Sequence, residues 1–265
     1  MSYGMAGNED APVLLLLHAI RNTRMLFAGI VPALAEHYRV VAVDLRGHGQ
    51  STDAASYTFA DIVEDLSGLL DAEGLEQVTV VAASFSAVPA QMLAVREPRR
   101  VTGLVLLDGG FYRLADMPGF ELESTVERLA AARFSSVEEA ESQFARRYGD
   151  GQLPPGWMAT ELERKEDGKY GYRLPREAFS AYFREYSAFP KEELFPSLSC
   201  PVRLLLADEK GLADDGQRGF FRQAAADYAR LVPHAVIRTI PDSLHLLMVT
   251  NPDDIVEEIK NVWNK

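Results

Sequence analysis

Ser84 occupies the position in this sequence that is best suited to a catalytic nucleophile. The apolar run Val78–Ala82 ends in Ala-Ala-Ser-Phe-Ser-Ala, and a helical pattern follows over residues 88–95. A serine at a sharp strand-to-helix turn has a strained backbone and an exposed hydroxyl, and the start of the helix stabilises negative charge nearby. The usual pattern there is G-x-S-x-G, whereas Ala82 and Ser86 replace both glycines here. Taken alone, the segment is a weak signal, and a structural serine explains it better than a catalytic one.

Three further polar segments follow other apolar runs. The segment His-Ala-Ile at 18–20 follows the first run, and Asp-Leu-Arg-Gly-His-Gly-Gln-Ser at 44–51 follows the second. His245 stands in a loop after the last run, just before the final helical pattern. Whether these segments can meet Ser84 depends on the elements that carry them.

Those elements are predicted to be the strands of a parallel sheet and the helices between them. The apolar runs are Val13–Leu17, Val40–Asp44, Val78–Ala82, Val101–Leu107, Val202–Leu206 and Ala235–Ile240. They lack polar alternation, which is typical of strands covered on both faces in an α/β protein. Asp61 with Glu64 predicts a capping box at one helix, and Asn251 before Pro252 predicts the start of the last helix. The pattern is a repeated βαβ unit.

The strand–helix alternation breaks between about residues 111 and 190. This segment is mostly helical in pattern and holds 14 of the chain's 25 aromatic residues. We therefore divide the chain into a core of residues 1–110 and 191–265 and a helical, aromatic-rich insertion of residues 111–190. An insertion at the carboxyl edge of a parallel sheet is well placed to cover a ligand crevice. Its aromatic residues either pack its own small core or also line a pocket.

With these segments in place, the sequence resembles the α/β-hydrolase family. The D-x-R-G-H-G-x-S segment carries the resemblance, together with the order of oxyanion loop, elbow serine, helical cap and late histidine from about Pro12 to Lys265. The resemblance implies a mostly parallel sheet of eight strands with helices on both faces, a cap at 111–190 and a Ser–acid–His triad. Because the first strong strand begins at Val13, we expect the leading hairpin to be reduced, with Tyr3–Gly7 as its remnant.

The resemblance also assigns roles to individual residues. Ser84 matches the nucleophile, and His245 matches the general base. The backbone N–H of Phe85 matches one oxyanion donor, and a second is expected from the loop at Ala19 or Ile20. Two amides of this kind stabilise the tetrahedral intermediate by about 2.7–4 kcal/mol per donor in other enzymes.

Two positions near the site differ from the family's motifs, and two further histidines could in principle take a catalytic role. Ala19 and Ser86 stand where the family has glycine, and the added side chains leave the backbone N–H groups available. His18 and His48 are further histidines near the site, and we interpret them as structural residues that bond within their loops.

The acid of the triad departs from the usual arrangement. Lys210 stands where the family places an aspartate after the strand at 202–206, and Asp208 and Glu209 lie nearby but out of register. Some family members carry the acid after the preceding strand instead, where this chain has Asp108. An acid from either strand can orient the same imidazole. We favour Asp108 over Glu209, with Asp208 as a further alternative.

Composition excludes several other classes of protein. The 265 residues include 27 basic and 39 acidic ones, and the net charge of −12 argues against nucleic acid and anionic membranes as partners. The single cysteine, Cys200, cannot form an internal disulfide, and nothing in the sequence activates it as a nucleophile. No His, Cys, Asp or Glu residues have metal-ligand spacing, so we expect no metal and no cofactor. We expect a cytoplasmic protein with a small-molecule substrate.

The sequence predicts a serine hydrolase that cleaves a carboxylic ester or lactone through an acyl-enzyme, with an apolar or aromatic substrate. A second hypothesis keeps the fold but changes the reaction to that of a lyase, a cofactor-free oxygenase or a perhydrolase. A third hypothesis is a hydrolase-like binding protein with little turnover, since Ala19, Ser86 and Lys210 replace residues of the family pattern.

Overall fold

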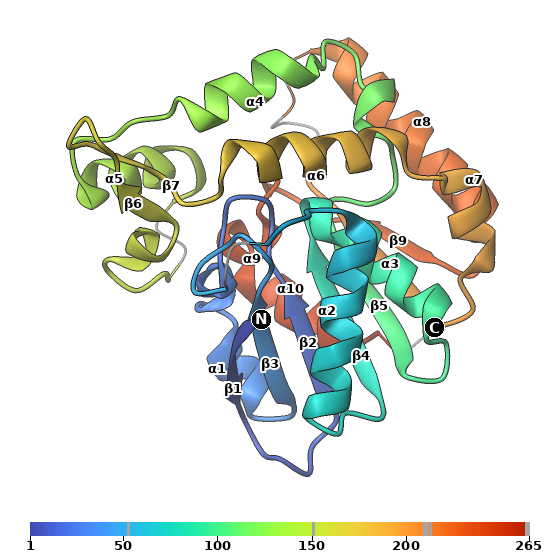
Figure 1. The fold of residues 1–265 in the computed structure, drawn as a ribbon. Helices are drawn as coiled ribbons and strands as arrows, with labels where there is room; N and C mark the ends of the chain where they lie inside the picture. The colour runs from blue at the N-terminus through green and yellow to red at the C-terminus, as the bar shows by residue number, and fades with distance from the viewer. Residues whose placement is uncertain (52–53, 150–151, 209–211, 213, 263–265) are drawn as a thin grey trace.

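The fold is built on a seven-stranded sheet with the strand order β1-β3-β2-β4-β5-β8-β9 (Figure 1). A computed structural model describes residues 1–51, 54–149, 152–208, 212 and 214–262. The strands are β1 Ser2–Ala6, β2 Val13–Leu17, β3 Arg39–Asp44, β4 Val78–Ala83, β5 Val101–Leu107, β8 Val202–Leu206 and β9 Val236–Thr239. β1 is antiparallel to β3, and every other neighbouring pair is parallel. The predicted α/β fold with a mostly parallel sheet is confirmed.

The number of strands differs from the expectation. The resemblance implied eight strands, and the sheet has seven within the described residues. Ahead of β2 the described chain has one strand, β1, which pairs with β3 from Ser2 opposite Asp44 to Ala6 opposite Val40. The expected reduction of the leading hairpin therefore takes the form of a single edge strand.

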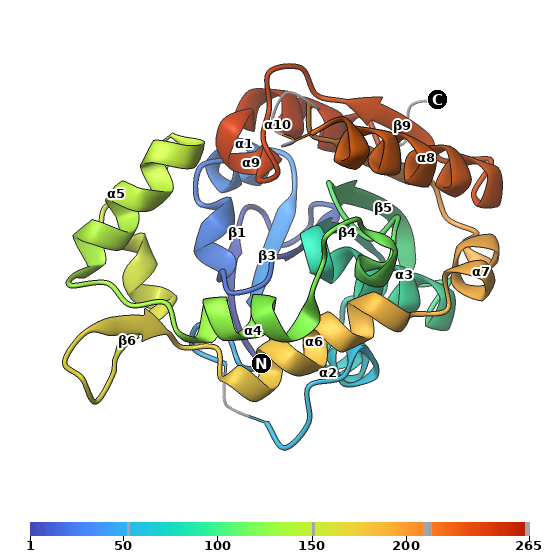
Figure 2. The same cartoon turned by 90° about the horizontal axis from the view of Figure 1, so that it is seen from above.

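The apolar runs form strands because helices cover both faces of the sheet. Leu14, Leu15, Leu16 and Leu17 of β2 are each at most 1% exposed. The helices of the core are α1 Val31–Ala35, α2 Phe59–Ala72, α3 Ala87–Arg96, α7 Lys191–Leu194, α8 Asp215–Leu231, α9 Leu247–Thr250 and α10 Pro252–Lys260. Helices α2, α3 and α8 lie on one face, where Tyr228 of α8 donates to Gln91 of α3, and α1 and α10 lie on the other (Figure 2). The six predicted strands are confirmed, with ends that differ by at most one residue.

The start of α2 is a correction to the sequence prediction. Its capping box is formed by Thr58 and Asp61, not by Asp61 and Glu64. Thr58 has extended backbone angles and accepts a hydrogen bond from the N–H of Asp61, whose carboxylate accepts the N–H of Thr58 in return. Glu64 instead pairs with Arg96 on the neighbouring helix α3. The last helix begins at Pro252, as predicted.

The insertion between β5 and β8 lies over the carboxyl edge of the sheet (Figures 1 and 2). Its helices are α4 Leu122–Ala130, α5 Val137–Tyr148 and α6 Arg176–Ala188, and α4 packs against α6. A small antiparallel hairpin, β6 Leu162–Arg164 with β7 Tyr170–Tyr172, was not predicted. Short 3₁₀ helices complete the fold at Arg24–Phe27, Ser84–Ser86, Leu114–Asp116, Trp157–Thr160 and Phe195–Ser197.

Candidate active site

Ser84, His245 and Asp108 form a continuous chain of hydrogen bonds at the carboxyl edge of the sheet. The Nδ1 of His245 lies 2.7 Å from Oδ2 of Asp108, and its Nε2 lies 2.9 Å from Oγ of Ser84. A carboxylate can only accept, so Nδ1 carries the proton and Nε2 accepts the serine hydroxyl. The side chain of His245 is 38% exposed and that of Asp108 is 18% exposed. The structure thus brings together three of the residues that the sequence singled out, from segments up to 161 residues apart.

The turn that presents Ser84 is strained and tightly packed. Ser84 follows β4 and has φ of +56°, in the left-handed region that costs a non-glycine residue about 1–2 kcal/mol. A Cβ on Gly109, at the end of the neighbouring strand β5, would lie 2.3 Å from the carbonyl oxygen of Ser84. Ala82 is fully buried before the turn, and so is Ser86 after it. The Ser86 hydroxyl lies 3.0 Å from the carbonyl oxygen of Leu17 and 2.9 Å from that of Ala83, so the serine that stands in place of the family's glycine can donate its proton to either backbone carbonyl.

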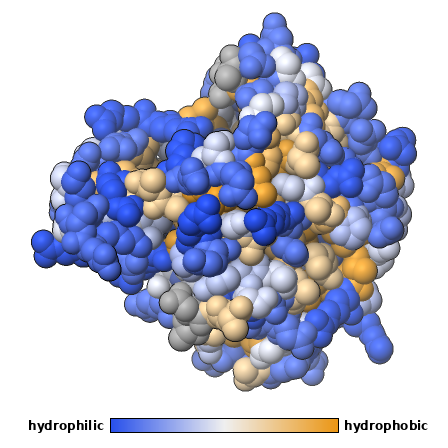
Figure 3. Space-filling view, turned by 45° about the horizontal axis from the view of Figure 1, so that its top comes forward, coloured by the Kyte–Doolittle hydropathy of each residue, from blue (hydrophilic) through white to orange (hydrophobic). Residues whose placement is uncertain are grey.

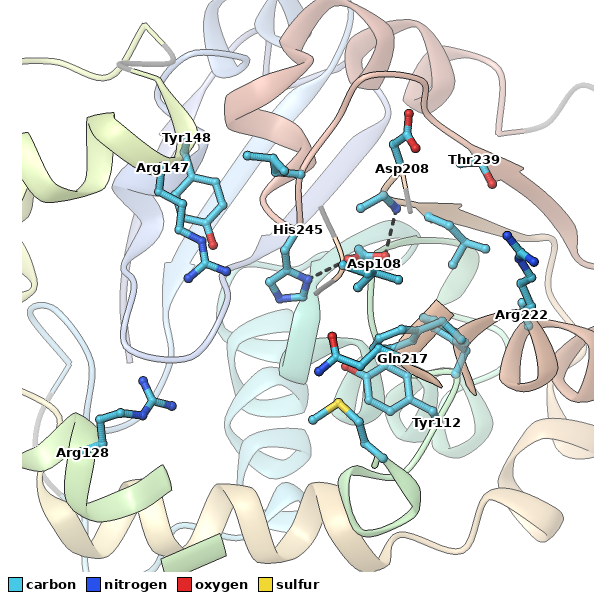
Figure 4. A pocket seen from close by; sticks show the side chains of 18 residues that line it. Asp108, Tyr112, Arg128, Arg147, Tyr148, Asp208, Gln217, Arg222, Thr239 and His245 are labelled. Atoms are coloured by element: carbon cyan, nitrogen blue, oxygen red, sulfur yellow. Dashed lines mark hydrogen bonds and ion pairs between the residues drawn. The ribbon is translucent and has the colours of Figure 1, made fainter. Parts of the chain in front are cut away.

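Asp108 is held in place by both of its carboxylate oxygens. While Oδ2 accepts from His245, Oδ1 accepts the backbone N–H of Ala207 at 2.9 Å (Figure 4). Asp108 also has a left-handed backbone, with φ of +49°. These contacts orient the carboxylate toward the imidazole, which is the arrangement that fixes the tautomer of a catalytic histidine.

The two alternative acids have different outcomes. Asp208 supports the loop that carries His245: its carboxylate accepts the N–H of Asp242 at 2.9 Å, and its own N–H donates to Ser243 at 3.0 Å. Glu209, like Lys210, lies outside the described residues. Of the candidates that the structure describes, Asp108 is the one bonded to His245.

Backbone N–H groups near Ser84 are available to bind an oxyanion. Phe85 is the second residue of the Ser84–Ser86 3₁₀ helix, where an N–H has no intrahelical acceptor. In the part of the chain that the structure describes, the N–H groups of Ala19, Ile20 and Phe85 have no hydrogen-bond acceptor. These are the amides that the sequence proposed as an oxyanion hole.

His18 and His48 are buried, neutral residues that tie the loop after β2 to the loop after β3. His18 accepts the N–H of Leu45 at 3.0 Å and donates to the carbonyl of Ala19. His48 accepts the N–H of Arg21 at 3.1 Å, and its other ring nitrogen lies 3.0 Å from the carbonyl oxygen of Arg46. Burial lowers the pKa of His18 to about 4 and holds the pKa of His48 well below its usual value. This geometry supports a structural role for both.

Three side-chain hydrogen bonds join the insertion to the loop after β2, and the sequence predicted none of them. Arg21 donates to the hydroxyl of Tyr172 at 2.6 Å, Asn22 donates to Glu161 at 2.7 Å, and Thr23 lies 2.7 Å from Thr160. The partners are 137 to 151 residues apart, so no local pattern could have revealed them.

Glu161 is the most unusual of these residues. It is 2% exposed, one of its oxygens has no partner, and burial raises its pKa from 4.5 to about 8. The carboxyl group is therefore mainly in its neutral form at pH 7.

Replacing Glu161 with glutamine is expected to remove a pH dependence of stability. The folded-state pKa lies above the unfolded one, so the folded state loses stability as pH rises from about 4.5 to about 8. Glutamine stays neutral and keeps an oxygen for Asn22. The free energy of unfolding of Glu161→Gln is expected to match the wild type near pH 4.5 and to exceed it at pH 8.5, measured by urea titration.

The matched control is Glu163→Gln on β6, two residues further along the chain, where the side chain is 43% exposed. It is expected to follow the wild-type pH profile. Equal slopes of stability against pH for wild type and Glu161→Gln would contradict a buried, neutral Glu161.

A cavity of about 910 Å³ opens in front of His245 and Asp108. Its walls come from the end of β5, the insertion, β8, α8 and the loop of His245 (Figure 4). The apolar part of the lining is Phe111, Tyr112, Met117, Leu206, Ala207, Leu212, Phe221, Ala225 and Leu244. On the surface, apolar atoms gather in the hollow between the insertion and the core and are partly overlain by hydrophilic side chains (Figure 3).

Two kinds of feature were not found among the residues that the structure describes. No three His, Cys, Asp or Glu side chains gather into a group that could hold a metal ion. No helix in the described ranges has the length and apolar content that crossing a bilayer requires.

The fold and this site define a class of proteins in which a serine on a tight turn after a parallel strand lies beside a histidine and a carboxylate. The sequence model described as "alpha/beta hydrolase fold" matches residues 12–252, and the chain belongs to that family. The expected family is confirmed, and with it the coarser assignment of the protein as a hydrolase.

Individual relatives are distant but cover nearly the whole chain. The sn-1-specific diacylglycerol lipase ABHD11 of Mus musculus is 24% identical over 98% of this chain and 83% of its own length. The crystal structure of E-2-(acetamidomethylene)succinate hydrolase superposes with a TM-score of 0.78 at 20% identity, covering 99% of this chain and 94% of that one. The enol-lactonase from Burkholderia xenovorans LB400 superposes with a TM-score of 0.71 at 16% identity, covering 100% and 96%.

Proposed function

We propose that this protein is a serine hydrolase that cleaves a carboxylic ester or a lactone through an acyl-enzyme. The observation that carries the proposal is the unbroken hydrogen-bond chain from Ser84 through His245 to Asp108 beside an open cavity. The names of the relatives, which include a lipase and an enol-lactonase, are consistent with this reaction class.

In the proposed first half-reaction, His245 takes the proton of Ser84 as Oγ attacks the substrate carbonyl carbon. The tetrahedral oxyanion accepts hydrogen bonds from the N–H of Phe85 and from the loop at Ala19 and Ile20. Asp108 stabilises the imidazolium that forms. His245 then donates its proton to the leaving alkoxide, the carbon–oxygen bond breaks, and the acyl group remains on Ser84.

In the second half-reaction, His245 removes a proton from a water molecule, and the hydroxide attacks the acyl carbon. The tetrahedral intermediate collapses, the carboxylic acid leaves, and Ser84 recovers the proton from His245. With a lactone, the alcohol and the acid are two ends of one product.

The lining of the cavity favours an apolar or aromatic part in the substrate. Phe111 and Tyr112 of the insertion reach the cavity, and Phe221 of α8 lies on the same side. In this proposal the insertion acts as a cap that shapes the pocket, while most of its aromatic residues pack its own core. The cytoplasmic location and the small-molecule substrate remain predictions.

Trapping of the acyl-enzyme intermediate tests the proposal. We expect a fluorophosphonate probe to label the protein once, with the adduct on Ser84 by peptide mass spectrometry, because the oxyanion site stabilises the tetrahedral phosphonate. A p-nitrophenyl ester is expected to give a burst of nitrophenolate equal to the enzyme concentration if deacylation is slower than acylation.

Two other outcomes would each support one of the alternative functions. Turnover of a non-ester substrate without labelling would favour the lyase, oxygenase or perhydrolase chemistry. Ligand binding without labelling or turnover would favour a binding protein.

A further inference from the structure

Two arginines of the insertion line the cavity that contains His245. Arg128 lies on α4 and Arg147 lies on α5. Both side chains point into the cavity, on the side of His245 away from α8 (Figure 4). Two arginines at such positions create a local cationic region in a protein whose net charge is −12.

Neither arginine is paired with an acid among the residues that the structure describes. Other arginines of the insertion are, since Arg133 pairs with Asp167 and Arg176 pairs with Glu123. An arginine that faces a cavity without a carboxylate partner can form bidentate hydrogen bonds to an anion there.

Neighbouring groups keep this end of the cavity cationic. Arg147 stacks over the ring of Tyr148, with its Cζ 5.2 Å from the ring centroid, which limits its orientations. The two acids that line the cavity, Asp108 and Asp208, lie on the other side of His245 from the two arginines (Figure 4).

The opposite end of the cavity is chemically different. Phe111, Tyr112 and Phe221, whose rings contact one another, form an apolar wall at the end of β5 and on α8. Gln217 and Arg222 of α8 line the same side of the cavity (Figure 4). His245 lies between the apolar wall and the arginines (Figure 4). A substrate whose carbonyl reaches Ser84 would thus extend one part toward apolar side chains and another toward Arg128 and Arg147.

We propose that the substrate carries a carboxylate, bound by Arg128 and Arg147, on one side of the scissile carbonyl and an apolar group on the other. This inference rests on the proposed ester or lactone hydrolysis and narrows its substrate class. The guanidinium groups act as binding and specificity residues, because they contact the substrate away from the reacting atoms.

A matched pair of esters tests the inference by turnover. The p-nitrophenyl monoester of adipic acid and p-nitrophenyl hexanoate have acyl chains of equal length and differ in the terminal carboxylate. We expect kcat/KM of the wild type to favour the anionic ester by about 10-fold or more, as a charge-assisted hydrogen bond provides. Arg128→Gln and Arg147→Gln are each expected to lose most of that preference through a higher KM for the anionic ester.

Arg146→Gln is the control, because Arg146 is the neighbouring exposed arginine on α5 and does not line the cavity. It removes the same charge and is expected to keep the preference. Normal hexanoate turnover with no preference for the anionic ester, or an equal loss in Arg146→Gln, would overturn the carboxylate site and leave the proposed hydrolysis standing.

A binding measurement separates the two proposals further. The Ser84→Ala protein, which cannot turn over an ester by this mechanism, is titrated with monomethyl adipate and with methyl hexanoate in a calorimeter. We expect tighter binding of monomethyl adipate, and about 10-fold weaker binding after Arg147→Gln is added. Equal affinity for the two esters would overturn the carboxylate site even if no ester is ever cleaved.

Discussion

Ser84→Ala is expected to lower kcat for an aryl ester by about 10⁶-fold, the loss seen when a comparable enzyme loses its nucleophile. The variant keeps the oxyanion amides and the cavity but has no oxygen to form the acyl-enzyme. His245 also loses the hydroxyl that lies 2.9 Å from its Nε2. The measurement is steady-state release of p-nitrophenolate, with fluorophosphonate labelling to quantify any wild-type contamination.

The control is Cys200→Ala, which removes the chain's single thiol. Cys200 is 8% exposed, and burial raises the pKa of its thiol to about 11, so it provides no thiolate at neutral pH. This variant is expected to retain kcat. Ester turnover at the wild-type rate in Ser84→Ala would exclude the acyl-enzyme mechanism.

Asp108→Asn is expected to lower kcat by about 10⁴-fold, as the same change does in a triad whose geometry is otherwise intact. The asparagine side chain can still accept from Ala207 through its oxygen, and its amide then faces His245 Nδ1 as a donor. The imidazole must turn to its other tautomer, whose Nε2 proton points at Ser84 and blocks general-base catalysis. The measurement is kcat with the same ester, together with unfolding curves to show that the fold is kept.

Glu209→Gln is the competing variant, since it tests the acid that the sequence placed nearer the usual position. We expect it to retain kcat within a factor of about 3, because Asp108 already occupies the acid's position on His245. A loss in Glu209→Gln as large as that expected for Asp108→Asn, with Asp108→Asn active, would reverse the assignment.

The strands of the sheet could be predicted because burial on both faces removes polar residues from them. Runs such as Val13–Leu17 and Val101–Leu107 have the same bounds in the sequence prediction and in the structure.

The start of α2 was placed too late because an aspartate such as Asp61 can be either the N-cap residue of a helix or the third residue after the N-cap. Only the extended backbone of Thr58 distinguishes the two. The β6–β7 hairpin was missed because three-residue strands carry no usable periodicity.

The candidate site was predicted to the extent that its residues follow strands. Ser84, Asp108 and His245 each come directly after a strand or in the loop beyond one, and parallel strands bring such positions to one edge. The choice between Asp108 and Glu209 depends on which carboxylate reaches the imidazole, and spacing along the chain does not contain that distance. The sequence also did not reveal that Arg128 and Arg147 line the cavity. They lie on different helices, and the residues that a helical side chain faces across a cavity leave no pattern in the sequence around it.

The hydrogen bonds between the insertion and the loop after β2 limit how parts of this protein can be exchanged with those of a relative. Specificity is often transferred by grafting one relative's lid onto another's core. In this chain the pairs Arg21–Tyr172, Asn22–Glu161 and Thr23–Thr160 join the segment to be exchanged to the loop that carries the proposed oxyanion amides. A chimera that exchanges residues 111–190 alone would bury Asn22 without its partner. Residues 21–23 and the insertion therefore have to be exchanged together if the chimera is to keep these hydrogen bonds.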